Sequence, residues 1–351
     1  MSRTTTELDQ GKASTGTIHL PNGQVLNVKS NISIEADEIP VIDVSGIYSE
    51  NIEDRKAVAE KVREASHRIG FFYAINHGID PKLADGAFEQ AKRFFAMPIE
   101  KKMEVDTALV PGEFVGYHAM HQYSGNDRKH KDLSEAFNIA YDAKYDPEAI
   151  TEEPSTSIFL PENDLPGFKD GLYAYHTRIL QFARKMTRIF ALALHLPEDF
   201  FADYIRQPEA GMRILHYPQQ EHSVDDQNGI GAHTDFECFT MVTQDSSGGM
   251  EVLSKSGYWI KAKPVPDSFV INIADCFMRQ TNDFFVSTVH RVINKSGKER
   301  YSIPFFYGFD RKKVLEPVPT CVSEDNPMKY PLMTSGEYYK WRASKAKDGE
   351  L

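Results

Sequence analysis

The sequence predicts an α+β protein with a helix-rich first part, a β-rich second part and a helix at the end of the chain. Before the β-rich part, apolar residues recur at helical spacing among charged residues. From Met212 onward, short apolar runs alternate with clusters of Gly, Asp, Asn and Ser, which is typical of a β-sandwich or barrel. After residue 331 the spacing indicates a helix again.

The first part opens with a polar, irregular segment, residues 1–37, which we expect to be a flexible arm with a weak hairpin signal at 21–23. The region 38–205 is expected to be mainly helical, because apolar residues such as Val58 and Val62 repeat one turn apart. Its expected elements are strands at 39–44 and 71–75, helices at 51–68, 81–95 and 168–196, and long loops over 106–170.

The second part, residues 206–320, is expected to form one β domain, followed by a C-terminal helical tail at 321–351. Its predicted strands are 212–217, 239–243, 250–253, 259–262, 268–273, 287–293 and 301–307. Near its end the tail carries a basic patch of four residues, which we expect on a solvated helix face. They are Lys340, Arg342, Lys345 and Lys347.

Composition limits the classes of function. The 351 residues are 41% hydrophobic and 26% charged, so the chain can bury a sizeable core. A net charge of -11 argues against a nucleic-acid partner, and the 3 cysteines are too widely spaced for a disulfide framework. No apolar stretch predicts a membrane span or a secretory signal, so we expect a soluble cytoplasmic protein, monomeric or homodimeric, with a small-molecule partner.

The motif His233-Thr234-Asp235 is the strongest chemical signal. On a strand, residues i and i+2 point to the same face, so His233 and Asp235 can reach one point. His290 lies on another predicted strand. Two histidines and one carboxylate form the facial triad that binds non-haem Fe(II) and leaves positions open for oxygen chemistry. With 12 histidines in the chain, one such pair can arise by chance, so the motif needs support.

Arg300 and Ser302 provide that support, because they follow His290 on one face of the next predicted strand. A guanidinium with a hydroxyl beside it is suited to binding a carboxylate. The chain therefore combines a metal motif with a carboxylate site, in an order and spacing that chance would not readily produce.

Together these motifs resemble the Fe(II)/2-oxoglutarate-dependent oxygenases of the isopenicillin N synthase-like superfamily, over roughly residues 38–345. The segments that carry the resemblance include GFFYAINHGI at 70–79, FFAMP at 94–98, HTD at 233–235, NIAD at 272–275, STVHRV at 287–292 and RYS at 300–302. The resemblance implies a double-stranded β-helix, or jelly-roll, core with the helical region packed against it.

The resemblance also implies roles for individual residues. Iron would be held by His233, Asp235 and His290. The distal carboxylate of 2-oxoglutarate would bind Arg300 and Ser302, with a further hydrogen bond from Tyr217. Arg213 would lie near the other carboxylate of this co-substrate or near the substrate.

The implied reaction consumes O2 and 2-oxoglutarate, releases succinate and CO2, and oxidises an unactivated C–H bond, with ascorbate as an accessory reductant. The outcome would be hydroxylation, desaturation or ring closure of a small organic molecule, in specialised metabolism. Aromatic residues are expected to line the substrate pocket. They are Tyr117, Phe137, Phe236, Phe239, Phe305 and Tyr307.

Two alternatives stay open at this point. Some close relatives keep the Arg-x-Ser pair but do not use 2-oxoglutarate, so the chain could be an iron oxidase whose substrate chelates the metal directly. The other alternative is a catalytically silent jelly-roll binding protein, although the intact triad argues against it.

Overall fold

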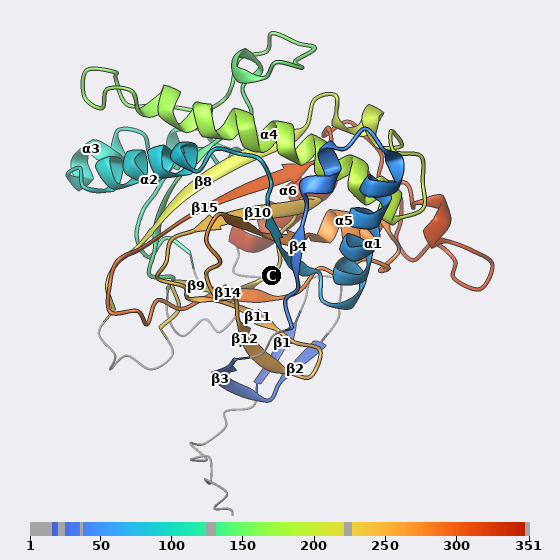
Figure 1. Cartoon of the computed structure of the whole chain (residues 1–351). Coiled ribbons are helices and arrows are strands. Elements are labelled where there is room, and N and C mark those ends of the chain that lie inside the picture. The colour runs from blue at the N-terminus through green and yellow to red at the C-terminus, as the bar shows by residue number, and fades with distance from the viewer. Residues whose placement is uncertain (1–15, 20–24, 36–37, 124–130, 221–226, 348–351) are drawn as a thin grey trace, which may run out of the picture.

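The computed structural model describes residues 16–19, 25–35, 38–123, 131–220 and 227–347. Two β-sheets lie face to face, and helices cover the outer face of the larger sheet (Figure 1). This arrangement confirms the predicted α+β class and the jelly-roll core.

The larger sheet has eight strands. In spatial order they are β4 (Val41–Asp43), β5 (Phe71–Ile75), β13 (Ser268–Ile273), β10 (Phe239–Gln244), β15 (Arg300–Gly308), β8 (Glu209–Tyr217), β7 (Glu135–Ile139) and β6 (Gly116–His118). The smaller sheet contains β3 (Ser30–Ile34), β12 (Tyr258–Lys261), β11 (Met250–Leu253), β14 (His290–Val292) and β9 (Ile230–His233). A separate hairpin pairs β1 (Gly16–His19) with β2 (Val25–Val28).

The helices form the outer layer and the connections. They are α1 (Ile52–Arg68), α2 (Pro81–Phe95), α3 (Ile99–Met103), α4 (Phe168–Ala193), α5 (Asp275–Gln280) and α6 (Ser335–Lys347). Local signals explain their starts: the side chain of Asn51 caps α1, and Asp80 caps α2 just before Pro81. The described helices include none that is both long and apolar enough to cross a bilayer.

Side-chain alternation gives the larger sheet two different faces. On β8, Met212 and Ile214 point toward the helices and join the main hydrophobic core, which α4 dominates. Arg213 and Tyr217, on the other face, point into the space between the two sheets. Polar side chains can therefore face the interior of the jelly roll without disturbing the helix-side core.

Strand pairing crosses the bounds of the predicted arm and of the predicted domains. Within the arm, β3 pairs in parallel with β12, so Ser33 lies beside Trp259 and this part extends the smaller sheet. The hairpin of β1 and β2 also forms, although its turn lies outside the described residues. The region 38–205 contributes β4 to β7 to the larger sheet, whose other four strands lie in the region 206–320. Pairing between strands distant in sequence leaves no local signal.

Gly70 is a backbone position that only glycine tolerates. Its φ is 71°, and a Cβ added there would lie 2.0 Å from the carbonyl oxygen of Val286. We expect Gly70→Ala to lower the free energy of unfolding by more than about 2 kcal/mol in denaturant titrations. Gly86→Ala is the matched control. Gly86 lies on the exposed face of α2, and its added Cβ would meet nothing within 4 Å. The control should be neutral or stabilise by up to about 1 kcal/mol. Equal effects of the two substitutions would contradict the prediction.

Candidate iron centre

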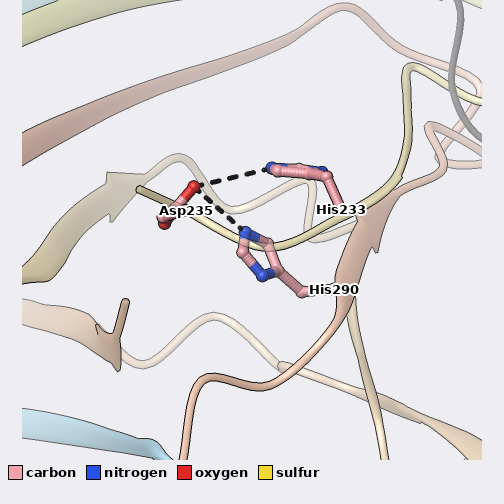
Figure 2. Close-up of side chains that lie close together, drawn as sticks. All are labelled: His233, Asp235 and His290. Atoms are coloured by element: carbon pink, nitrogen blue, oxygen red, sulfur yellow. Dashed lines mark ion pairs between the residues drawn. The ribbon is translucent and has the colours of Figure 1, made fainter. Parts of the chain in front are cut away.

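The pairing of β9 with β14 brings the two predicted histidine ligands together. In this antiparallel pair, His233 is the register partner of His290, and Asp235 follows two residues after His233. Figure 2 shows the three side chains converging from these segments. Their ligand atoms all lie within 4.8 Å of one another, and all three residues line one cavity. The structure thus assembles the predicted triad.

Each imidazole is oriented by the carbonyl group two residues before it in the chain. His233 Nδ1 lies 2.8 Å from the oxygen of Gly231, and His290 Nδ1 lies 3.1 Å from that of Thr288. Because a carbonyl oxygen only accepts hydrogen bonds, each Nδ1 carries the proton and each Nε2 has a free lone pair. The two Nε2 atoms point at Asp235 Oδ1, at 3.7 and 3.8 Å. These donors fit a divalent iron ion.

The second oxygen of Asp235 is held by two neighbours that sequence reasoning missed. Its Oδ2 accepts hydrogen bonds from Thr240 Oγ1 at 2.6 Å and from Asn272 Nδ2 at 2.7 Å. Both donors are buried on adjacent strands, β10 and β13. The carboxylate is thereby fixed with Oδ1 turned toward the two imidazoles.

The electrostatics of the site favour the protonation states that bind metal. Burial, together with the nearby His290, lowers the pKa of His233 to about 4, so its imidazole is neutral at neutral pH. Burial acts to raise the pKa of Asp235, but the two histidines and the bonds from Thr240 and Asn272 outweigh it and lower that pKa. Neutral imidazole and ionised carboxylate are the forms that bind Fe(II).

The predicted carboxylate site lies in the same cavity, which has a volume of about 540 Å³. Arg300 is buried and donates from Nη1 to Ser302 Oγ at 3.1 Å and from Nε to the carbonyl oxygen of Gly248. Its guanidinium carbon lies 4.5 Å from the ring centre of Tyr217, its register partner on β8. The structure therefore brings Arg300, Ser302 and Tyr217 together, and Arg213 lines the same cavity.

Comparison with known proteins agrees with this geometry. The family model of the 2OG-Fe(II) oxygenase superfamily matches residues 208–309, and that of the non-haem dioxygenase in morphine synthesis N-terminal region matches residues 39–162. The 2-oxoglutarate-Fe(II) type oxidoreductase ppzC of Metarhizium majus is 40% identical over 84% of this chain and 83% of its own length. The chain belongs to the 2OG-Fe(II) oxygenase superfamily. The resemblance seen in the sequence is thereby confirmed.

Two further relatives extend the comparison. The 2-oxoglutarate-Fe(II) type oxidoreductase hxnY of Emericella nidulans is 34% identical over 84% of this chain and 86% of its own length. The crystal structure of a full-length Neurospora crassa protein in complex with alpha-KG and thymine has a TM-score of 0.77 and 27% identity, and the match covers 89% of this chain and 98% of the Neurospora chain. The oxygenase described here is thus a 2-oxoglutarate-Fe(II) type oxidoreductase that uses Fe(II) and 2-oxoglutarate, with His233, Asp235 and His290 as its iron triad.

The aromatic residues expected in the substrate pocket divide between the cavity and the helix-side core. Phe236 lines the cavity of the oxygenase. The other five pack into the helix-side core instead. They are Tyr117, Phe137, Phe239, Phe305 and Tyr307. Neighbouring residues on β15 such as Pro304 and Phe306 face the cavity in their place, because side chains alternate along a strand.

Arg342 departs from its expected place on a solvated helix face, because it is fully buried. It donates to Asp275 Oδ2, from Nε at 3.0 Å, and to Thr234 Oγ1, from Nη2 at 3.0 Å. Thr234 lies between two iron ligands, and the guanidinium also packs 4.5 Å from the ring centre of Phe236. The spacing of Arg342 one turn after the buried Tyr338 was the available signal. Through these contacts of Arg342, α6 therefore supports the segment that carries His233 and Asp235.

Thr240→Val should weaken iron binding, because Asp235 Oδ2 would lose one of its two donors. We expect the dissociation constant for Fe(II), measured anaerobically, to rise roughly 10- to 100-fold. Thr243→Val is the matched control: it lies on the same strand, and its hydroxyl contacts Tyr175 rather than Asp235. The prediction is wrong if both variants bind iron equally well.

Arg342→Met should both destabilise the oxygenase and weaken iron binding. Burial raises the pKa of the Asp275 carboxyl and Arg342 opposes this shift, so the substitution leaves a buried acid without its cation. We expect the free energy of unfolding to fall by about 3–5 kcal/mol, with a higher Fe(II) dissociation constant in the fraction that is folded. Exposed Lys340→Met on the same helix should change neither quantity. Unchanged iron affinity of Arg342→Met would refute the positioning role.

Proposed function

We propose that this oxygenase couples decarboxylation of 2-oxoglutarate, with release of succinate and CO2, to oxidation of an unactivated C–H bond of a small organic molecule. The observation that carries the proposal is the shared cavity, into which both the iron triad and the Arg300–Ser302 pair open. Hydroxylation, desaturation or ring closure would depend on how the substrate is held. The apolar and aromatic groups of the cavity wall, among them Phe236, Ile230 and Val292, favour a substrate of specialised metabolism.

Arg300 supports the placement of 2-oxoglutarate. Its guanidinium is buried, and no acidic side chain of the described residues forms an ion pair with it. A buried cation requires a counter-charge, and the distal carboxylate of the co-substrate supplies one in fork geometry. Ser302 Oγ and the hydroxyl of Tyr217 would complete the hydrogen bonds to this carboxylate.

The chain's own residues would orient and shield the reactants. His233, Asp235 and His290 occupy one side of the metal position, which leaves its other side open to the cavity. Bound iron supplies the activation of O2. The largely apolar wall excludes water from the substrate and so protects the chemistry from side reactions.

Anaerobic reconstitution with Fe(II) and 2-oxoglutarate tests the proposal. We expect a visible metal-to-ligand charge-transfer band that His233→Ala abolishes. Arg300→Ala should raise the dissociation constant of 2-oxoglutarate at least about 100-fold, because two charge-assisted hydrogen bonds are lost. Arg178→Ala, an exposed arginine on α4, is the matched control and should leave the band unchanged.

The alternatives predict other results. Bound iron without a charge-transfer band would favour an oxidase whose substrate chelates the metal directly. Absence of iron binding would favour a silent binding protein. Succinate formed in step with an oxidised product would establish the proposed coupling.

A further inference from the structure

Two polar side chains on the wall of the cavity, on adjacent strands, each have a buried atom without a hydrogen-bond partner among the described residues. Asn138 on β7 and Arg213 on β8 are register partners in an antiparallel pair, so they share one face of the sheet. Both line the cavity that contains the iron triad. Directly opposite residues have Cβ atoms about 5 Å apart, so one small group can contact both side chains.

The hydrogen-bonding capacity of each side chain is defined. Asn138 Nδ2 donates to the carbonyl oxygen of Phe114 at 2.7 Å, which sets the amide orientation and leaves Oδ1 buried with no partner among the described residues. Asn138 as a whole is 8% exposed. Arg213 Nε is also buried and has no hydrogen-bond partner among the described residues. No described acidic residue forms an ion pair with the Arg213 guanidinium. An acceptor and a donor are thus left side by side.

The co-substrate cannot satisfy both side chains of this pair. Arg213 is four residues from Tyr217 on β8, or about 13 Å along the strand, so the distal carboxylate placed near Arg300 is not the group that lies between Asn138 and Arg213. At neutral pH, 2-oxoglutarate also carries only acceptors, which cannot satisfy Asn138 Oδ1. The pair must therefore serve a ligand that has its own hydrogen-bond donor.

We propose that Asn138 and Arg213 recognise an amide edge of the substrate, that is, an N–H group next to a C=O group. The N–H donates to Asn138 Oδ1, and the carbonyl oxygen accepts from Arg213. Lactams, imides and secondary amides in the cis arrangement carry this edge. The inference rests on the proposed function in two respects: it takes the cavity beside the iron as the substrate site, and it places the distal carboxylate of 2-oxoglutarate at Arg300.

Calorimetric titration with 2-piperidone and N-methyl-2-piperidone tests the inference. The two probes differ in the N–H donor and in the methyl group that replaces its hydrogen, and a site built to bond the N–H group rejects the methylated analogue. On the chain loaded with Fe(II) and 2-oxoglutarate, we expect N-methylation to weaken binding at least about 10-fold. Equal affinities, or no binding of either probe at millimolar concentration, would overturn the inference.

Three variants keep the test independent of folding defects. Asn138→Leu should bind both probes equally, while Gln207→Leu, which removes an amide elsewhere on the cavity wall, should keep the discrimination. Arg213→Met should lose binding of both probes without lowering the unfolding temperature, because it removes a half-buried charge that has no counter-charge among the described residues. A lower unfolding temperature would indicate a structural role for Arg213 instead.

The same samples separate this inference from the proposed function. Calorimetry on the metal-free chain measures the preference for N–H without iron, whereas the charge-transfer band measures the co-substrate complex without the probe. A normal band with no preference for the N–H probe would refute only the amide edge. A preference for that probe without any band would refute only the proposed reaction.

Discussion

The antiparallel register of β9 and β14 is the constraint on which the rest of the site depends. It places His233 opposite His290, and the carbonyl groups of Gly231 and Thr288, each two residues before its histidine, turn both Nε2 atoms toward Asp235. A slip of one residue would send one imidazole to the other face of the smaller sheet. Iron binding is therefore a property of strand pairing, because no single segment could assemble the triad.

The larger sheet also separates two tasks between its faces, packing on one and polar residues of the cavity on the other. The helix-facing side chains of β8 and β15 pack under α2 and α4, and this core supports the sheet without using its inner face. The inner face is then free to carry Arg213, Tyr217, Arg300 and Ser302. Apolar packing on one side of a strand thereby allows buried charge on the other, at residues that alternate in the sequence.

Three guanidinium groups in this region have different partners, and the difference indicates their roles. Arg342 is paired with Asp275 inside the protein, so its charge is balanced and it acts on the position of Thr234. Arg300 and Arg213 have no acidic partner among the described residues, and both face the cavity. A buried charge that the fold leaves unbalanced is suited to a ligand that brings the complementary group.

The sequence by itself determined the order of the main helices and strands, the three iron ligands and the Arg-x-Ser pair, because each depends on local spacing or on a short motif. Only the tertiary structure decided where each aromatic residue lies. Phe137 and Phe305 pack in the helix-side core, whereas Phe236 lines the cavity. It also buried Arg342 and set Asn138 beside Arg213. These relations depend on pairing and packing between segments far apart in the chain, and alternation within one segment cannot show which of its faces will be the inner one.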